Sequence, residues 1–328
     1  MTDDPPREQR EVTVVVITWE ARDLVLRCLA ALAAQTTPAA RVRLHVVDNA
    51  SHDGTAEAVA RDFPEATLQV LATNTGFAGG CSAALAQIAS EWVVLVNNDA
   101  VVAPDFLERL LAERHDHPQT AAWTARVLLA ADVEGTARVN STGVVVHRDG
   151  NGADRDYLVP ADAPGPPAEV FGFCGAAVLL RASAVRAVGG FDAAYFLYYE
   201  DTDLSWRLRL GGWDVRYVHG AVVHHEHGAS SGIGSPRFRY YNERNRLTTL
   251  LKDAPWGAVL PVVLRHPVMS VVRIARGGPE RAVGMTRLRA YAGFLRMAPR
   301  TVAQRRGMPP AMRARRREVA RLLVSPSG

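Results

Sequence analysis

The chain has 328 residues, of which 48% are hydrophobic and 22% are charged, as is typical of a globular protein with a sizeable core. Its 3 cysteines, Cys28, Cys81 and Cys174, are few and widely spaced, which argues against a disulfide framework or a zinc knuckle and indicates a reducing compartment. Residues 1–10 are polar and mixed in charge, without the basic-then-apolar order of a signal peptide, and we expect them to be disordered.

The formal net charge of +4 conceals a strong asymmetry along the chain. From Pro261 to the end there are 15 Arg and 2 Glu, a net charge of +13, whereas the preceding residues carry a net charge of −9. A strongly basic segment after an acidic body indicates that the segment contacts something negatively charged, either the body or an external partner.

The first 115 residues alternate apolar, β-branched runs with segments that have apolar residues at helical spacing. Continuous runs of this kind are typical of strands buried on both faces. The expected strands are 12–17, 42–47, 67–71 and 92–96, and the expected helices are 24–35, 55–61, 81–90 and 104–114. This alternation predicts an α/β fold with a parallel sheet and right-handed crossovers.

Each expected strand ends in a polar or glycine-rich loop, and the run at 92–96 ends in Asn97, Asn98 and Asp99. Open α/β sheets bind ligands beyond the carboxyl ends of their strands. Carboxylate and amide oxygens there are suitable ligands for a divalent cation that also binds phosphate. The alternative is a turn rich in Asn and Asp that simply ends the strand.

The second half of the chain has shorter elements. The expected strands are 123–129, 139–147, 168–173, 215–218 and 221–223, and the expected helices are 183–188, 201–210 and 237–252. Residues 149–167 are rich in Gly, Asp and Pro and are expected to form a mobile loop, residues 195–199 are aromatic and expected to be extended, and 228–236 is another loop. The acidic segment 200–203 begins a helix, where complementing the helix dipole is the simplest explanation of its charge.

After Pro255 the chain changes in character. Residues 256–274 are largely apolar but interrupted by Arg265, His266, Pro267 and Arg273, which argues against a transmembrane helix. Residues 281–300 and 311–323 are predicted to be basic amphipathic helices that bind an anionic membrane surface. Packing on the acidic body, or on a second copy in a homodimer, is the alternative. Nucleic acid is disfavoured because aromatic residues are sparse in this segment.

The loops 48–51, 74–80, 97–99 and 200–203 together resemble, in order and spacing, those of inverting glycosyltransferases of family 2 with the GT-A fold. The resemblance covers residues 11–250 and is strongest to bacterial rhamnosyltransferases of cell-wall and polysaccharide assembly. It implies a GT-A domain over 11–254, with a nucleotide-sugar-binding half at 11–115 and an acceptor and catalytic half at 116–254. Residues 255–328 then form a separate basic helical region.

The resemblance also implies roles for residues of the nucleotide-sugar site. Asp48 would accept a hydrogen bond from the imide of a uracil or thymine base, and Arg244 would clamp the diphosphate, although a solvated helical face explains Arg244 nearly as well. The other residues that it places around the nucleotide are Thr18, Glu20, Asn49, Ser51, Asn74, Gly76, Gly79, Asn97 and Asn98.

For the metal, Asp99 is the retained carboxylate of the family's DxD-type motif and would bind Mn²⁺ or Mg²⁺. The earlier position of that motif is Asn97, which lowers the negative charge of the site. His225 fits the family spacing for a further ligand, with His224 and His227 as competitors. A zinc site is disfavoured because nothing in the sequence completes it.

For catalysis, Glu200 and Asp201 occupy the family's ED position, which makes Asp201 the general base. The resemblance therefore implies a metal-dependent enzyme that uses a dTDP- or UDP-linked sugar, with dTDP-rhamnose the best single donor. The acceptor would be a lipid-linked glycan at the cytoplasmic face of the cell membrane.

Other classes fit the sequence less well. A non-catalytic nucleotide-sugar-binding or scaffold protein would not need both Asp99 and Asp201. A dehydrogenase would need the G-x-G-x-x-G turn, which is absent after the first strand, where the sequence is Thr18-Trp19-Glu20-Ala21.

Overall fold

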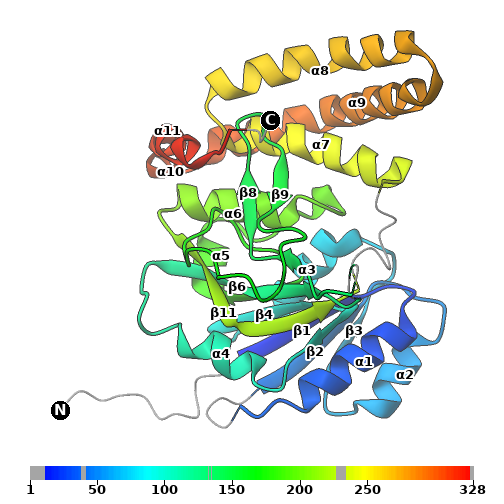
Figure 1. Cartoon of the computed structure of the whole chain (residues 1–328), viewed down its shortest axis with the longest axis vertical. Coiled ribbons are helices and arrows are strands. Elements are labelled where there is room, and N and C mark those ends of the chain that lie inside the picture. The colour runs from blue at the N-terminus through cyan, green and yellow to red at the C-terminus, as the bar shows by residue number, and fades with distance from the viewer. Residues whose placement is uncertain (1–11, 38–41, 132, 134, 227–233, 326–328) are drawn as a thin grey trace.

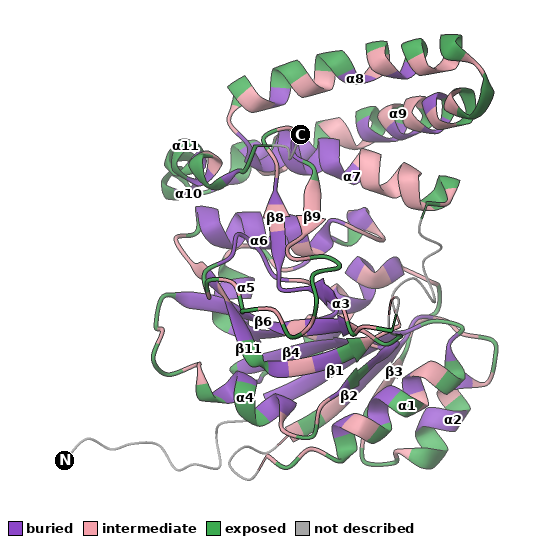
Figure 2. Cartoon of the chain, in the orientation of Figure 1, coloured by how far each residue is buried: buried purple, intermediate pink, exposed green. Residues whose placement is uncertain are grey.

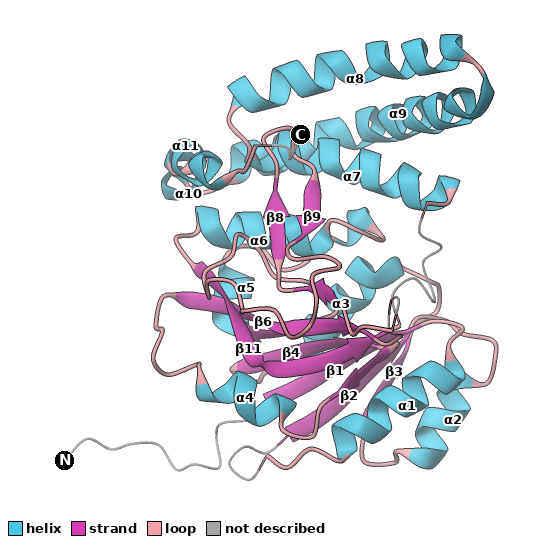
Figure 3. Cartoon of the chain, viewed as in Figure 1, coloured by secondary structure: helices cyan, strands magenta, loops and turns pink. Residues whose placement is uncertain are grey.

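The computed structural model describes residues 12–37, 42–131, 133, 135–226 and 234–325 (Figure 1). The segment 1–10, His227 and most of the loop 228–236 therefore lie outside the described residues. The described chain forms a central sheet flanked by helices on both faces, with helices stacked beyond one side of it (Figures 1 and 3).

The first four βα units form as the sequence predicts. Their strands β1 (Val12–Thr18), β2 (Val42–Asp48), β3 (Thr67–Val70) and β4 (Trp92–Asn97) are parallel, in the order β3-β2-β1-β4. Their helices are α1 (Arg22–Ala33), α2 (Thr55–Asp62), α3 (Gly76–Gln87) and α4 (Phe106–Ala112).

Beyond β4 the sheet is mixed. The next strand, β10 (Ala177–Arg181), is antiparallel to β4 and to β6 (Thr120–Leu129). Ala177 pairs with Val96 because the chain reaches the carboxyl end of β4 after a long excursion and must run back along it. The sheet then continues through β11 (Asp214–His225) to β5 (Ala100–Val102), while β7 (Val139–Ser141) pairs with β6.

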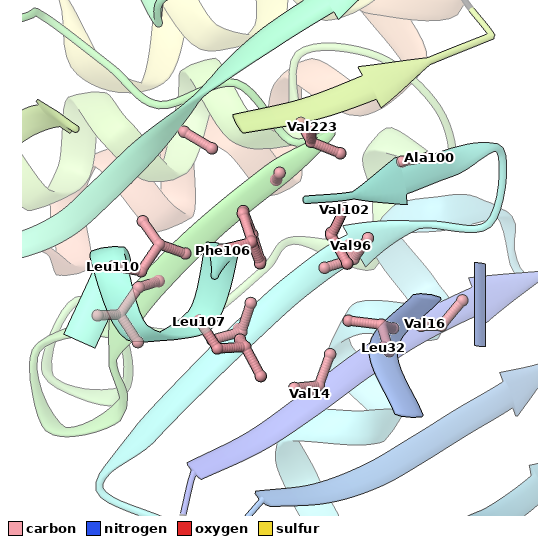
Figure 4. Close-up of a cluster of buried hydrophobic side chains, with 14 of the residues drawn as sticks. Val14, Val16, Leu32, Val96, Ala100, Val102, Phe106, Leu107, Leu110 and Val223 are labelled. Carbon is pink, nitrogen blue, oxygen red and sulfur yellow. The ribbon is translucent and has the colours of Figure 1, made fainter. Parts of the chain in front are cut away.

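Both faces of the sheet are covered, as expected for strands without polar alternation. Alternate residues of β1 and β4 enter two different clusters. Val14, Val16 and Val96 pack against α1 and α4 through residues such as Leu32, Phe106 and Leu110 (Figure 4). Val15, Ile17 and Leu95 face α3, α5 (Ala182–Ala187) and α6 (Glu200–Leu210). This packing fixes the register of the strand ends that carry the site.

Several segments of the second half differ from expectation. The run 139–147 is broken at Gly143, which has φ +117°, so β7 is followed by a hairpin of β8 (Val144–Val146) and β9 (Gly152–Asp154). Part of the expected loop at 149–167 is therefore the strand β9. Residues 168–173 make isolated bridges to Arg216 and Val144 and are not a strand. The two expected strands at 215–223 are one strand, β11, with an irregularity between Val218 and Val222.

The aromatic segment 195–199 is not extended. A 3₁₀ turn (Ala193–Tyr195) is followed by Phe196, Tyr198 and Tyr199 with φ of +65°, +66° and +70°. The amide of Asn245 on α7 (Pro236–Asp253) donates to the carbonyls of Tyr195, Leu197 and Tyr198 at 3.1, 2.9 and 2.7 Å. A buried side chain about 50 residues later therefore fixes this compact turn, which no local pattern could reveal.

The C-terminal helices pack on the body. They are α8 (Trp256–Arg276), α9 (Gly278–Gly307), α10 (Pro310–Ala314) and α11 (Arg316–Val319). Their residues share one core cluster with β8, α6 and α7, including Val146, Trp206, Leu247 and Phe294. Pro261 and Pro267 do not interrupt α8. Within the described part of the chain it alone is long and apolar enough to cross a membrane, judged by length and composition only.

Candidate active site

A cavity of about 530 Å³ opens at the carboxyl ends of β1 and β4. The start of α6, the β8–β9 hairpin and the start of α7 supply its other walls. A smaller cavity of about 120 Å³ shares Ile17, Phe77, Asn98 and Leu197 with it. The residues of the larger cavity that carry polar side chains of interest are Asn97, Asn98, Asp99, Asn140, Asp154, Glu200, Asp201, Thr202, His225 and Asn242.

Asp99 and His225 lie side by side in this cavity, because β11 ends beside β5 with His225 opposite Ala100. Nδ1 of His225 lies 2.7 Å from Oδ1 of Asn140, which can only accept, so Nδ1 carries the proton. Nε2 of His225 then lies 3.0 Å from Oδ1 of Asp99. In the neutral imidazole both of these atoms are lone-pair donors, so a proton or a cation between them is needed to offset their repulsion.

This pair fits a divalent cation only as part of its coordination shell. Among the described residues no group of three or more His, Cys, Asp or Glu side chains is placed to hold a metal. A cation bound by Asp99 and His225 would therefore complete its shell with water and phosphate oxygens, as Mg²⁺ commonly does. His224 on the same strand is exposed, so His225 is the better placed of these two histidines.

Glu200 and Asp201 form the first turn of α6, directly after Tyr199 with its positive φ. Oδ2 of Asp201 accepts a hydrogen bond from the backbone N–H of Gly175 at 3.2 Å, and Oδ1 accepts from the N–H and hydroxyl of Thr202 at 2.6 and 3.2 Å. Burial raises the pKa of Asp201. The hydrogen bonds fix the carboxylate at the wall of the cavity, and burial gives it a raised proton affinity. Both properties suit a general base.

Glu200 is buried, and its Oε2 has no hydrogen-bond partner. Burial, followed by the charge of Asp201, raises the pKa of Glu200 well above the ordinary value. Burial and the neighbouring charge of Asp201 thus both disfavour a second negative charge on Glu200.

Asp154 on β9 is a cavity residue that sequence reasoning missed. Burial, together with the charge of Asp201, raises the pKa of Asp154 to about 6, although a hydrogen bond from Ser141 opposes the shift. The hydroxyl of Tyr199 accepts from the N–H of Gly152 at 2.9 Å, which holds the hairpin next to α6. In the sequence Asp154 is one of several aspartates in a glycine-rich stretch, and nothing there distinguishes it.

The expected nucleotide residues divide into two groups. Thr18, Asn49, Asn74, Gly76 and Asn98 line the smaller cavity. Within this group Asn49 also joins two loops, because its amide donates to the carbonyl of Gly76 at 3.0 Å and accepts from the N–H of Thr75 at 2.8 Å. The side chain of Asn98 donates to the hydroxyl of Thr18 at 3.2 Å.

Asp48, Glu20, Ser51 and Gly79 line neither cavity. Asp48 is fully buried, with one oxygen accepting from the N–H of Ser51 at 3.2 Å and Oδ1 lacking a hydrogen-bond partner. The N–H of Glu20 donates to the hydroxyl of Ser51 at 2.9 Å, which ties the loops after β1 and β2 together. A role of these residues at a nucleotide stays a prediction.

The glycines have packing roles. Gly76 has φ +72°, and a Cβ there would lie 2.1 Å from the carbonyl oxygen of Phe196. A Cβ on Gly79 would lie 2.5 Å from the side chain of Thr75. Both positions therefore require glycine. They lie in the first part of α3, so the segment 76–80, which was expected to be a loop, belongs to the helix.

Arg244 lines neither cavity. Its guanidinium donates to the carbonyls of Ala194 and Tyr195 at 3.2 and 2.6 Å and lies 4.8 Å from the ring centre of Tyr241. Arg237, seven residues earlier on the same side of α7, lines the smaller cavity and was not predicted from the sequence. A diphosphate contact by Arg244 stays a prediction, and Arg237 is the arginine that the structure places at the cavity wall.

Comparison with known proteins identifies this architecture. The model of the family described as "Glycosyltransferase like family 2" matches residues 6–246. The chain belongs to this family. It is therefore a glycosyltransferase, and its mixed sheet is that of the GT-A fold.

The sequence identity to individual relatives is low. This glycosyltransferase is 28% identical over 246 residues to an N-acetylglucosaminyl-diphospho-decaprenol L-rhamnosyltransferase of Mycobacterium tuberculosis. The alignment covers 67% of this chain and 77% of that protein. A mannosyltransferase of Pyrobaculum calidifontis, solved with GDP-Man and Mn²⁺, aligns over 93% of this chain and 86% of its own, with TM-score 0.54 and 19% identity. S. aureus TarS 1-349 aligns over 95% and 89%, with TM-score 0.55 and 18% identity.

Proposed function

We propose that this glycosyltransferase moves rhamnose from dTDP-rhamnose to a lipid-linked glycan of the cell wall or of a polysaccharide, in one metal-dependent, inverting step. The observation that carries the proposal is that one cavity holds Asp201 and, at another wall, the pair Asp99 and His225. A base for the acceptor and a cation site for the donor diphosphate are the two parts that such a transfer needs.

In the reaction, the acceptor hydroxyl gives its proton to Asp201 as its oxygen forms a bond to the anomeric carbon. The bond between that carbon and the donor diphosphate breaks, and the diphosphate keeps the electron pair. Because attack and departure occur on opposite sides of the carbon, one displacement inverts the configuration. Burial and the charge of Asp201 raise the pKa of Glu200, which disfavours a second carboxylate that would compete for the acceptor proton.

Asp99 and His225 are the residues that would hold Mn²⁺ or Mg²⁺. When bound, the cation would stabilise negative charge on the departing diphosphate. Asn140 sets the tautomer of His225, so that Nε2, which also lies 3.4 Å from the amide nitrogen of Asn97, presents its lone pair beside Asp99. The Mn²⁺ in the mannosyltransferase relative supports this proposal.

The nucleotide identity is proposed from Asp48 and from the sequence relative. Oδ1 of Asp48 has no hydrogen-bond partner and would accept from the imide N–H of thymine or uracil. The M. tuberculosis relative is a rhamnosyltransferase that acts on a diphospho-decaprenol glycan, which supports rhamnose and a lipid-linked acceptor. We further propose that the enzyme is a peripheral protein of the cytoplasmic membrane face, where such an acceptor is accessible.

The test is calorimetric titration of the enzyme with dTDP and with UDP, with and without Mn²⁺. We expect micromolar dTDP binding that weakens at least about tenfold without Mn²⁺ or in Asp99→Ala. As a matched control, Asp105→Ala removes an exposed carboxylate on the same segment and should leave binding unchanged. Tighter binding of UDP than of dTDP would mean that the donor is a UDP-linked sugar. Equal binding with and without Mn²⁺ would remove the metal from the proposal.

A further inference from the structure

The outer face of α8 is an exposed apolar stripe. It consists of Trp256, Leu260, Leu264, Val268, Val271 and Val272, of which Leu264 is 67% exposed and Val268 60% exposed. The first four are spaced four residues apart, so they lie along one side of the helix. Figure 2 shows this exposed side at the edge of the molecule, farthest from the sheet. Contiguous exposed apolar side chains of this size indicate a surface that binds something.

The opposite side of α8 is fixed to the body. His266 is buried, its Nε2 lies 3.1 Å from Oε2 of Glu243 on α7, and Ser270 is buried beside it. A Cβ on Gly284 of α9 would lie 2.6 Å from the carbonyl of Ser270, so the two helices are in close backbone contact. The orientation of α8 is therefore set, and the apolar stripe faces outward in the folded protein.

Exposed arginines lie on α8 and on the adjacent helix α9. Arg265 and Arg276 on α8 and Arg281, Arg289 and Arg296 on α9 are exposed. The only acidic residues from Pro261 to the end of the chain are Glu280 and Glu318. Glu280 is paired with Arg273. The surface is thus apolar along its centre and positively charged beside it, which complements the acyl boundary and phosphates of an anionic bilayer.

We propose that the α8 outer face docks this enzyme onto an anionic membrane, with α8 lying in the plane of the interface. The apolar stripe enters the headgroup and acyl boundary, while the neighbouring arginines bind lipid phosphates. The sequence placed this contact on the amphipathic helices at 281–300 and 311–323, whereas here α8 supplies the apolar surface and α9 supplies only neighbouring arginines. The proposed function supplies only the purpose of this docking, which is access to a lipid-linked acceptor.

The contacts of α8 argue against the two other arrangements. If α8 crossed the bilayer, Arg265 and His266 would sit near the middle of the hydrocarbon, and His266 would lose Glu243. If the stripe joined two copies of the chain, Arg265 and Arg276 of each copy would enter the interface with no acidic side chain on the α8 outer face to pair with them. A lipid phosphate satisfies these arginines, and a second copy does not.

The experiment is co-sedimentation of the full chain with vesicles of phosphatidylcholine alone and of phosphatidylcholine with phosphatidylglycerol. We expect binding to the mixed vesicles that is reversed by high salt. Leu264→Glu and Val268→Glu should each lower the vesicle partition coefficient at least about tenfold. In each variant an apolar side chain that would enter the bilayer is replaced by a negative charge that anionic lipid repels. Val70→Glu is the matched control, since Val70 is 57% exposed on β3 at a distant edge and should bind like wild type.

Four other outcomes would overturn the docking proposal. Two concern vesicle binding: no binding of the wild-type chain, or a loss of binding in Val70→Glu as large as that in the α8 variants. A third is resistance to alkaline carbonate extraction, which indicates a spanning helix. The fourth is a dimer in sedimentation velocity that Val268→Glu converts to a monomer. Nucleotide binding measured on the same samples separates the two proposals, because its failure would remove the proposed function while leaving vesicle binding intact.

Discussion

At the scale of single residues, the site contrasts two adjacent carboxylates. Asp201 is held by three hydrogen-bond donors, whereas Glu200 has a buried oxygen without a partner. Burial raises the pKa of both carboxylates, but that of Glu200 well above its ordinary value. Burial thus disfavours ionisation of Glu200 more strongly than that of Asp201, and we expect the two residues to respond differently to neutral substitution.

We expect Asp201→Asn to lower kcat at least about 100-fold while the affinity for dTDP changes less than about twofold, because the amide cannot take the acceptor proton. Glu200→Gln is the matched control. It puts an amide of similar shape in place of a carboxyl whose raised pKa disfavours its charge, so we expect kcat to stay within about fivefold of wild type. Steady-state kinetics and calorimetry on the same preparations measure both. If Glu200→Gln lowered kcat as much as Asp201→Asn does, the assignment of the general base to Asp201 and not Glu200 would be wrong.

The residues that sequence reasoning could find are those that follow a strand directly or begin a helix. Asp99 and Asp201 stand at such positions within motifs of the family, and the structure brings both to one cavity. Asp154 and Asn140 could not be found, because their place depends on how the β8–β9 hairpin and β7 fold over the sheet. Arg237 and Arg244 are both on α7, and only the packing of that helix decides which one faces the cavity.

At the scale of elements, one carboxylate joins three helices. Glu243 on α7 pairs with Arg246 on the same helix at 2.8 Å, with His266 on α8 at 3.1 Å and with Arg287 on α9. Its side chain is only 14% exposed. Burial alone would raise the pKa of Glu243, but the hydrogen bond to His266 and the charges of Arg246 and Arg287 lower it to about 2. The α7–α8–α9 stack is thus held by an ionised group.

This shift predicts how stability depends on pH. A folded pKa of about 2, below the ordinary 4.5, means that the stabilisation is fully present above pH 4.5 and is lost as the pH falls toward 2. The shift corresponds to about 3 kcal/mol at neutral pH. We therefore expect Glu243→Gln to lower the free energy of unfolding in urea by about 3 kcal/mol at pH 7, and the difference from wild type to shrink as the pH falls below 4.5.

Glu280→Gln is the control for that measurement. Glu280 pairs with Arg273 on the same pair of helices, but both side chains are more than a third exposed, so the pair should contribute less than about 1 kcal/mol. A difference between Glu243→Gln and wild type that does not change with pH would mean that packing, and not the charge of Glu243, sets the stability.

The elements that the sequence predicted well are those set by local pattern. The four βα units follow from β-branched runs and helical spacing, and they are confirmed in order and direction. The antiparallel entry of β10 and the turn at 195–199 depend on pairing with β4 and on the amide of Asn245, both distant in sequence. The periodicity of a segment carries no information about such partners.

At the scale of the whole molecule, the basic charge of the C-terminal region divides into two sets. Arg305 and Arg316 are buried and point inward, where Arg305 donates to the carbonyls of Leu251 and Ala254 at 2.8 and 2.6 Å. Arginines such as Arg289 and Arg296 are exposed. Packing on the body and contact with a partner were alternatives in the sequence, and the buried arginines show that the first occurs.

The boundary expected between residues 254 and 255 stays a prediction, and packing across it leads us to expect that the two sides fold together. Val259, Phe294 and Met312 of the C-terminal region are 1%, 2% and 7% exposed and share a cluster with Trp206 and Leu250 of the catalytic body. Loss of a single large buried side chain from such a cluster typically costs about 2 to 5 kcal/mol. Since a whole domain is stabilised by only about 5 to 15 kcal/mol, the body depends on these helices.

We thus expect a chain ending at Ala254 to aggregate on expression, or to melt at least about 10 °C below the full chain in differential scanning calorimetry. The full-length double variant Leu264→Glu with Val268→Glu separates folding from docking. Both residues are on the exposed side of α8, so this variant should keep the melting temperature of wild type while losing vesicle binding. If the chain ending at Ala254 instead melted like wild type and bound dTDP, the C-terminal helices would be an appendage, and the expected boundary at 254 would stand.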